Sequence, residues 1–276
     1  MSPYWRLIRP GLLLTVLFSM AVAALTATQP PPLARLVDAM LGAALLIAGA
    51  TAMNQLIERR LDAAMKRTAL RPLPSNCLSA RQAAMFAAIA SLAGVGVLAA
   101  LESSVVTFLA VLSWVIYVLI YTPLKLASVW HMPIGAIAGA IPVLLGAATA
   151  DAAFTRTSLA LFGIVFFWQF PHTAAIGWIY RDEYASGEMK VAAVVDPSGR
   201  LAGRLALFGA AGLLLASLVP TASPLYLVIA LSLGLAHVAL AAKFLARTTD
   251  ANARALWRMS LVHLPVLLTS LLLVIR

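Results

Sequence analysis

The chain of 276 residues is strongly apolar, with 62% of residues in the set AVILMFWYC, only 11% charged residues and a mean hydropathy of +0.95. Soluble domains average about 45–50% apolar and about 25% charged residues, so the composition excludes a soluble enzyme, a disordered chain and a secreted disulfide scaffold. The net charge of +10 could suit a nucleic-acid binder, but such a protein would not place most of its length in lipid. We therefore expect a membrane protein that crosses the bilayer several times and has no nucleic-acid partner.

Nine apolar stretches are long enough to cross a bilayer, since a spanning helix needs roughly 20 mostly apolar residues. They cover residues 11–27, 38–57, 83–101, 105–124, 132–150, 158–179, 201–219, 224–243 and 257–275. The uncharged run 205–242 is too long for one helix, and Pro220 and Pro224 divide it. The sequence predicts an all-α integral membrane protein, a bundle of about nine transmembrane helices that forms a single domain over residues 1–276.

The first stretch has a second interpretation. Arg6 and Arg9 precede a short apolar run, and this pattern is also typical of a secretory signal peptide. The run is long for that purpose, and no small-x-small cleavage site lies near Ala27. We therefore expect a first membrane helix, with the signal peptide as the alternative.

The basic residues divide unequally between the two faces of this bundle. With nine spans, the N-terminus and the loops after the second, fourth, sixth and eighth spans share one side. All basic residues except Arg35, Arg156 and Arg276 fall there. Short loops rich in Lys and Arg stay cytoplasmic, so we expect a cytoplasmic N-terminus in a bacterial-type inner membrane.

Two of the cytoplasmic loops also carry acids. Asn54, Glu58 and Asp62 are spaced by four residues at the end of the second span, so they share one helix face. Basic residues follow directly at Lys66, Arg67 and Arg71. The loop after the sixth span contains Arg181, Asp182, Glu183 and Lys190. The acid-rich motifs therefore lie at the cytoplasmic ends of the second and sixth helices.

These acids need an explanation other than topology, to which carboxylates contribute little. Mg²⁺ is usually held by one or two carboxylates together with water and phosphate oxygens. Arg and Lys neutralise the remaining phosphate charge. The pattern predicts a site for a phosphorylated, anionic lipid with Mg²⁺ at the cytoplasmic end of the bundle.

The same loops resemble those of the protoheme IX farnesyltransferases, a branch of the UbiA-type intramembrane prenyltransferases. The matching segments are Asn54-Gln55-Leu56-Ile57-Glu58 with Asp62, Met65, Arg67-Thr68 and Arg71-Pro72-Leu73, then Tyr121-Thr122-Pro123-Leu124-Lys125, and then Trp168-Gln169-Phe170-Pro171-His172 with Arg181-Asp182-Glu183-Tyr184. The resemblance implies transfer of a farnesyl group from farnesyl diphosphate to a vinyl group of heme b, with addition of water, to give heme O. It also implies heme A synthase or a terminal oxidase assembly as candidate partners.

The resemblance assigns roles to individual residues. The candidate metal ligands are Glu58, Asp62, Asp182 and Glu183, and the candidate diphosphate-binding residues are Asn54, Lys66, Arg67, Arg71, Arg181 and Lys190. The candidate catalytic residues are Glu58, Asp62, Asp182 and His172. His172 lies inside an apolar span, where an ionisable residue is a functional candidate by default, and the family pattern gives it heme contact or proton transfer. Four aromatic residues could steady an allylic cation, although ordinary packing is the simpler interpretation of each: Tyr117, Tyr121, Phe166 and Phe167.

The chain departs from the family pattern at several positions, and these departures bear on the identity of the acceptor. These are Leu126, His131, Thr173, Glu183 and the segment 190–193. They leave a quinone precursor or a chlorin open as the acceptor. A transporter or a non-enzymatic heme-handling protein is a further alternative, but transporter sites lie near the bilayer midplane, whereas these acids lie at one edge. We interpret His237 and His263 as bundle residues with satisfied hydrogen bonds and Cys77 as an ordinary loop residue.

Overall fold

The computed structural model describes residues 2–220 and 223–274, and these residues form helices and connecting loops without a strand. The helices are α1 (Pro3–Leu7), α2 (Pro10–Leu25), α3 (Leu33–Ala64), α4 (Ala80–Leu101), α5 (Ser104–Val115), the π-helix η1 (Ile116–Tyr121), α6 (Thr122–Ala127), α7 (His131–Ala148), α8 (Arg156–Ile179), α9 (Arg181–Ser186), α10 (Ala192–Val195), α11 (Arg200–Ser217), α12 (Pro224–Ala246) and α13 (Asp250–Val274). The predicted all-α fold is confirmed for this part of the chain.

The number of membrane helices agrees with the prediction. Among the described residues, 8 helices are long and apolar enough to cross a bilayer, with α5, η1 and α6 counted as one, and the shorter apolar helix α2 adds another. The second span is longer than predicted because α3 continues to Ala64. The end of the last predicted span, Ile275, and Arg276 lie outside the described residues.

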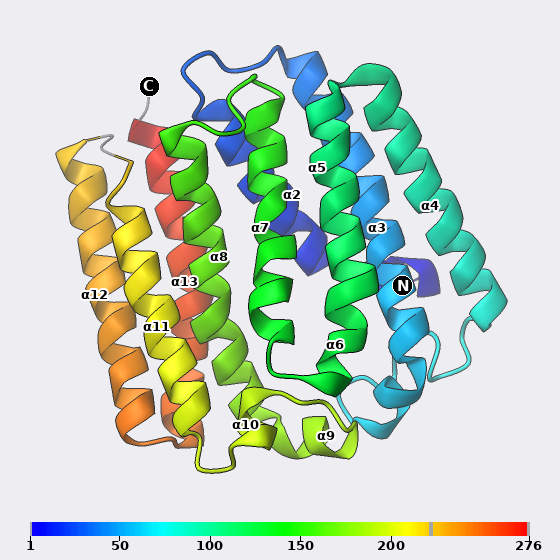
Figure 1. Ribbon diagram of the computed structural model, residues 1–276, viewed down its shortest axis with the longest axis vertical. Coiled ribbons are helices and arrows are strands. Elements are labelled where there is room, and N and C mark those ends of the chain that lie inside the picture. Colours follow the sequence, from blue (N-terminus) through cyan, green and yellow to red (C-terminus); the bar gives the residue numbers. More distant parts are fainter. Residues whose placement is uncertain (1, 221–222, 275–276) are drawn as a thin grey trace.

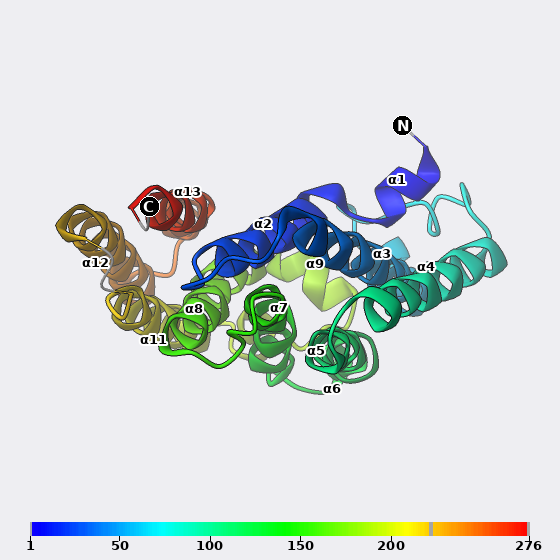
Figure 2. The ribbon, with the colours of Figure 1, turned by 90° about the horizontal axis from the view of Figure 1, so that it is seen from above.

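The long helices run roughly side by side, with both acid-rich segments at the same end (Figure 1). That end contains the end of α3 and the short helices α6, α9 and α10. Seen from above, α8, α11, α12 and α13 form one half of the bundle, and α2 to α7 form the other (Figure 2). The backbone N–H of Arg67 donates a hydrogen bond to Glu183 Oε2 at 2.9 Å, which joins the loop after α3 to α9.

Small residues let helices of the half formed by α2 to α7 approach one another closely. A Cβ at Gly94 of α4 would lie 2.6 Å from the backbone nitrogen of Leu46 of α3. A Cβ at Gly146 of α7 would overlap the backbone carbonyl oxygen of Met20 of α2. Membrane helices associate through van der Waals packing, so close backbone contact at small residues stabilises them.

A π-helix, η1, interrupts the span formed by α5, η1 and α6. Pro123 has no N–H to donate, and the N–H of Thr122 bonds to the carbonyl oxygen of Tyr117, five residues earlier. The hydroxyl of Thr122 donates to the same carbonyl oxygen at 2.8 Å. Short π-helical turns are rare and often occur at functional sites. Tyr117 and Tyr121 of this turn and Lys125 of the following helix α6 line a common cavity.

Candidate active site

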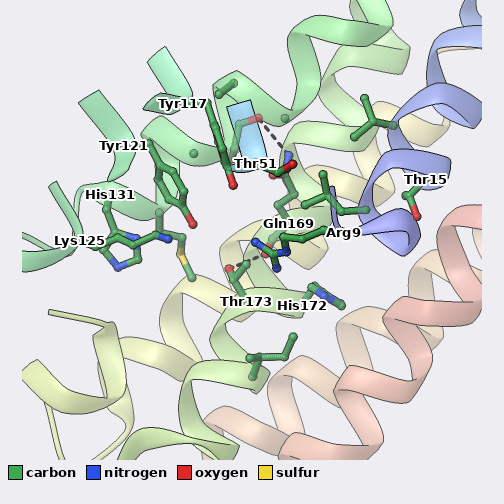
Figure 3. A pocket seen from close by; sticks show the side chains of 18 of the residues that line it. Arg9, Thr15, Thr51, Tyr117, Tyr121, Lys125, His131, Gln169, His172 and Thr173 are labelled. Atoms are coloured by element: carbon green, nitrogen blue, oxygen red, sulfur yellow. Dashed lines mark hydrogen bonds between the residues drawn. The ribbon is translucent and has the colours of Figure 1, made fainter. Parts of the chain in front are cut away.

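A cavity of about 680 Å³ lies between the two halves (Figure 3). Its lining includes Glu58 and Asp62, so it extends to the end of the bundle that carries the acid-rich segments. Away from that end, the walls of the cavity are mostly apolar residues of α2, α3, α7 and α8. Ligand sites are commonly concave and apolar with a few placed polar groups. The polar and aromatic side chains that line it are Arg9, Thr15, Ser19, Thr51, Glu58, Asp62, Arg67, Thr68, Arg71, Ser113, Trp114, Tyr117, Tyr121, Lys125, His131, Trp168, Gln169, His172, Thr173 and Tyr184.

Glu58 and Asp62 both lie on the face of α3 that lines this cavity. Each is buried, with 3% and 0% of its surface exposed. Lys125 Nζ donates to Glu58 Oε1 at 2.6 Å, and Arg71 Nη1 lies 2.7 Å from both carboxylate oxygens of Asp62. Buried charges require such partners. Each carboxylate is therefore paired with a basic side chain that could instead pair with a phosphate group.

Asn54 lies one turn before Glu58 and is fully buried. Its Nδ2 donates to the hydroxyl of Thr122 at 3.1 Å, which ties α3 to the π-helical turn. Its Oδ1 is buried without a hydrogen-bond partner among the described residues. A buried oxygen without a partner is unusual, but Asn54 does not line the cavity, whereas Glu58 and Asp62 on the same helix do. The carboxylates of Glu58 and Asp62 supply hard oxygen donors that fit Mg²⁺, which prefers oxygen ligands.

The second acid-rich segment forms α9, beside the mouth of the cavity. Glu183 accepts the hydrogen bond from the Arg67 backbone, whereas Asp182 is exposed. Neither acid lines the cavity. Within residues 2–220 and 223–274, no group of three or more His, Cys, Asp or Glu side chains is close enough to hold a metal ion. The joint metal role of the two segments therefore stays a prediction.

The structure separates the predicted diphosphate-binding residues into two groups. Arg67 and Arg71 line the cavity, and the Arg67 guanidinium lies over the rings of Tyr180 and Tyr184. Arg181 Nη1 instead bonds to Asp250 Oδ1 of α13 at 2.9 Å. The other three predicted residues also lie outside the cavity lining: Lys66 and Lys190 are exposed, and Asn54 is buried.

Two cations of the cavity had no role in the sequence-based prediction, namely Lys125 and Arg9. Lys125 belongs to a segment of the family resemblance, but its pairing with Glu58 joins residues 67 positions apart. Arg9 precedes Pro10 at the start of α2 and has a left-handed backbone (φ 51°). In the sequence, Arg9 contributes only to the predicted topology. The one local sign of a special position is that Arg9 directly precedes Pro10 at the start of a helix.

Arg9 extends from the start of α2 into the cavity (Figure 3). Burial acts to lower the pKa of Arg9, but the phenol groups of Tyr117 and Tyr121 and the carboxyl groups of Glu58 and Asp62 raise it, and the net result is a pKa above the ordinary value. The guanidinium therefore stays charged. No salt bridge to Arg9 exists within the described part of the chain.

We expect Arg9→Gln to raise the KM for a prenyl diphosphate about 10-fold, since a hydrogen bond to a charged group contributes about 1.5–3 kcal/mol. The matched control is Arg6→Gln, because Arg6 is exposed and its side chain bonds to the carbonyl of Leu70 outside the cavity. Steady-state kinetics on both variants provide the check. An equal KM in the Arg9 variant and the wild type would contradict a contact between Arg9 and the diphosphate.

Two of the candidate aromatic residues and two of the histidines lie outside the cavity lining. Phe166 and Phe167 pack in the apolar core, so the packing interpretation suffices for them. The Nδ1 atoms of His237 and His263 lie 3.0 Å apart and are hydrogen-bonded, whereas both Nε2 atoms are buried without a partner among the described residues. The prediction that these two histidines have satisfied hydrogen bonds is therefore half correct.

The fold and the cavity together define an integral, multi-pass membrane protein with a cavity that joins buried carboxylate–cation pairs to apolar walls. The family model of the UbiA prenyltransferase family matches residues 12–263. The chain therefore belongs to the UbiA prenyltransferase family. The predicted family and the predicted enzyme class are confirmed, and the transporter alternative is set aside.

Similar proteins carry a more specific name. The chain is 36% identical to the protoheme IX farnesyltransferase of Solibacter usitatus over 85% of this chain and 82% of that protein. It is 34% identical to the protein of the same name from Opitutus terrae over 98% of this chain and 93% of that protein. The resemblance found in the two loops therefore extends over most of the sequence.

Solved structures share the fold at low sequence identity. A UbiA homolog from Aeropyrum pernix K1 gives a TM-score of 0.74 at 18% identity, covering 96% of this chain and 98% of that one. A UbiA homolog from Archaeoglobus fulgidus, bound to DMAPP and Mg²⁺, gives 0.69 at 16% identity, covering 99% and 100%. These similarities establish the helical arrangement.

Proposed function

We propose that this protein transfers a farnesyl group from farnesyl diphosphate to a vinyl group of heme b, with Mg²⁺ as the metal, and so makes heme O. The observation that carries the proposal is one cavity that joins buried carboxylate–cation pairs to an apolar chamber with His172 on its wall. The relatives named protoheme IX farnesyltransferase support the reaction. The Archaeoglobus homolog with DMAPP and Mg²⁺ supports the diphosphate and the metal.

At the end of the cavity that contains Glu58 and Asp62, the two carboxylates would exchange their Lys125 and Arg71 partners for the metal. Glu58 and Asp62 would hold Mg²⁺, with Asp182 and Glu183 supplying the second set of carboxylates. When bound, the metal would stabilise the negative charge that develops on the leaving diphosphate. Lys125 and Arg71, which pair with these two carboxylates in the structure, would neutralise the phosphate oxygens. Arg67 and Arg9 add positive charge from two further sides.

The apolar part of the cavity protects the reactive group. Exclusion of water keeps an allylic cation from being hydrolysed before it meets the acceptor. Tyr117 and Tyr121 are stacked with ring centroids 5.4 Å apart, beside the carboxylate–cation pairs. Aromatic faces attract cations by roughly 1–2 kcal/mol when water is excluded. We assign to these two rings the stabilisation of positive charge on the prenyl group.

The same proposal includes the setting of the enzyme. The acid-rich end would face the cytoplasm, with the N-terminus on the same side, in the inner membrane of a bacterial-type cell. Residues 1–276 would form one catalytic domain. Heme A synthase or a terminal oxidase assembly would receive the product.

Release of pyrophosphate tests the proposed reaction. We expect purified protein with farnesyl diphosphate and Mg²⁺ to release pyrophosphate rapidly when heme b is added, and excess EDTA to stop the release. In parallel reactions, an aromatic quinone precursor or a chlorin replaces heme b. Stimulation by one of these and not by heme b would overturn the heme assignment, and full release in EDTA would overturn the metal role.

A further inference from the structure

The ring of His172 is held from two sides on the wall of the cavity. Its Nδ1 lies 2.8 Å from Ser260 Oγ, and Ser260 belongs to α13, 88 residues away in sequence. The indole of Trp168 stacks on the ring with centroids 4.8 Å apart at 22°. The same indole donates from Nε1 to the backbone carbonyl oxygen of Ser260 at 2.7 Å. Trp168 and Ser260 therefore fix both the plane and the direction of the imidazole.

The hydroxyl of Ser260 determines which nitrogen of His172 carries the proton. Ser260 Oγ lies 2.6 Å from the carbonyl oxygen of Trp257. Two oxygens at this distance share a hydrogen atom, and the only hydrogen available is the one on Oγ. Ser260 must then accept at its oxygen, so Nδ1 of His172 carries the hydrogen and donates it. In the neutral ring the other nitrogen, Nε2, has a lone pair and no hydrogen.

The lone pair of Nε2 is available to a ligand. His172 lines the cavity, and within the described residues its Nε2 has no hydrogen-bond partner. A neutral imidazole whose Nδ1–H is bonded to an oxygen is the usual form of a metal-binding histidine, because that bond orients the ring and increases its basicity. The arrangement therefore suits a metal centre brought into the cavity by a substrate.

The other histidines are less suited to this role. His131 also lines the cavity, but its Nδ1 is buried without a partner among the described residues, so no contact fixes its tautomer. Its ring is tilted against that of Tyr121, with centroids 5.9 Å apart at 52°, beside the charged end where the diphosphate is expected. His237 and His263 are fully buried and bond to each other.

We propose that Ser260 is a positioning residue that holds His172 as the Nδ1–H tautomer, so that Nε2 ligates the iron of the porphyrin acceptor. This inference rests on the proposed function, because that function brings an iron porphyrin into the cavity. The iron would then be held on the wall formed by α8 and α13, at a fixed position relative to the π-helical turn that carries Tyr117 and Tyr121.

Absorption and electron paramagnetic resonance spectra of heme b added to the purified protein test the proposal. We expect the wild type to show a histidine-ligated iron, and His172→Ala to lose that signature. Ser260→Ala should weaken heme binding about 10-fold or more, whereas Ser260→Thr, which keeps the hydroxyl, should restore it. The Trp168 bond is to the backbone of Ser260 and remains in both variants. His131→Ala is the matched control and should keep the wild-type spectrum.

Several results would overturn the inference. The histidine signature could persist in His172→Ala, or Ser260→Ala could bind heme as the wild type does. If the wild type bound heme without a histidine signature, and Ser260→Ala shifted the pH profile of heme O formation, His172 would transfer protons and would not ligate iron. These failures leave the proposed function standing when the wild type still makes heme O. If the wild type neither binds heme b nor makes heme O, the proposed function fails as well.

Discussion

Asp182→Asn is expected to lower the rate of prenyl transfer by about 100-fold or more while the protein stays folded. Asp182 is exposed on α9 and has no side-chain hydrogen bond among the described residues, so its carboxylate contributes little to stability. The expected loss in rate comes from the metal, since removal of one group that stabilises transition-state charge typically costs 10²–10³-fold. Single-turnover kinetics at saturating Mg²⁺ measure the effect, and the unfolding midpoint in detergent checks the fold.

Glu188→Gln is the matched control for Asp182→Asn. Glu188 is an exposed acid in the same segment, it lies outside the cavity lining, and no metal role is assigned to it. Asp62→Asn would be a less clean test, because Asp62 is buried against Arg71. Breaking a buried ion pair from one side is strongly destabilising. A wild-type rate in Asp182→Asn would remove α9 from the metal site.

Gly146→Ala is expected to destabilise the protein by roughly 3 kcal/mol, the upper part of the range for overpacking. The new methyl group would overlap the backbone carbonyl of Met20, and backbone cannot move aside as a flexible side chain can. At about 2–4 °C per kcal/mol for a protein of this size class, the unfolding midpoint should fall by roughly 6–12 °C.

Gly96→Ala provides the matched control for that substitution. Gly96 is also a helical glycine, in α4, but a Cβ there would meet nothing within 4 Å. Alanine is the better helix former by about 1 kcal/mol, so the midpoint should be unchanged or higher. Equal midpoints for the Gly146 and Gly96 variants would contradict the close approach of α2 and α7.

The sequence predicted the membrane helices and the shared helix face of Glu58 and Asp62, because both depend on local patterns. Length and hydropathy of each stretch were sufficient for the helices. The spacing of Glu58 and Asp62 placed both on one face of α3, and that face lines the cavity. Both positions follow from helical geometry and need no knowledge of other segments.

The partners of these residues could not be predicted, because they come from distant segments. Lys125 reaches Glu58 across 67 positions, and Arg181 turns to Asp250 across 69. Ser260 reaches His172 across 88. Apolar helices have little polar periodicity to indicate which faces meet, so helix pairing depends on small residues and close packing. The π-helical turn before Pro123 likewise depends on a local change of hydrogen bonding that residue patterns do not reveal.

The mass of the product tests the central claim most directly. Purified protein is incubated with farnesyl diphosphate, heme b and Mg²⁺, and the porphyrins are then extracted and measured by mass spectrometry. We predict a heme that has gained one farnesyl group and one hydroxyl group from water, and none when EDTA is present. Unmodified heme b, together with a prenylated aromatic product when an aromatic acceptor is supplied, would contradict the account.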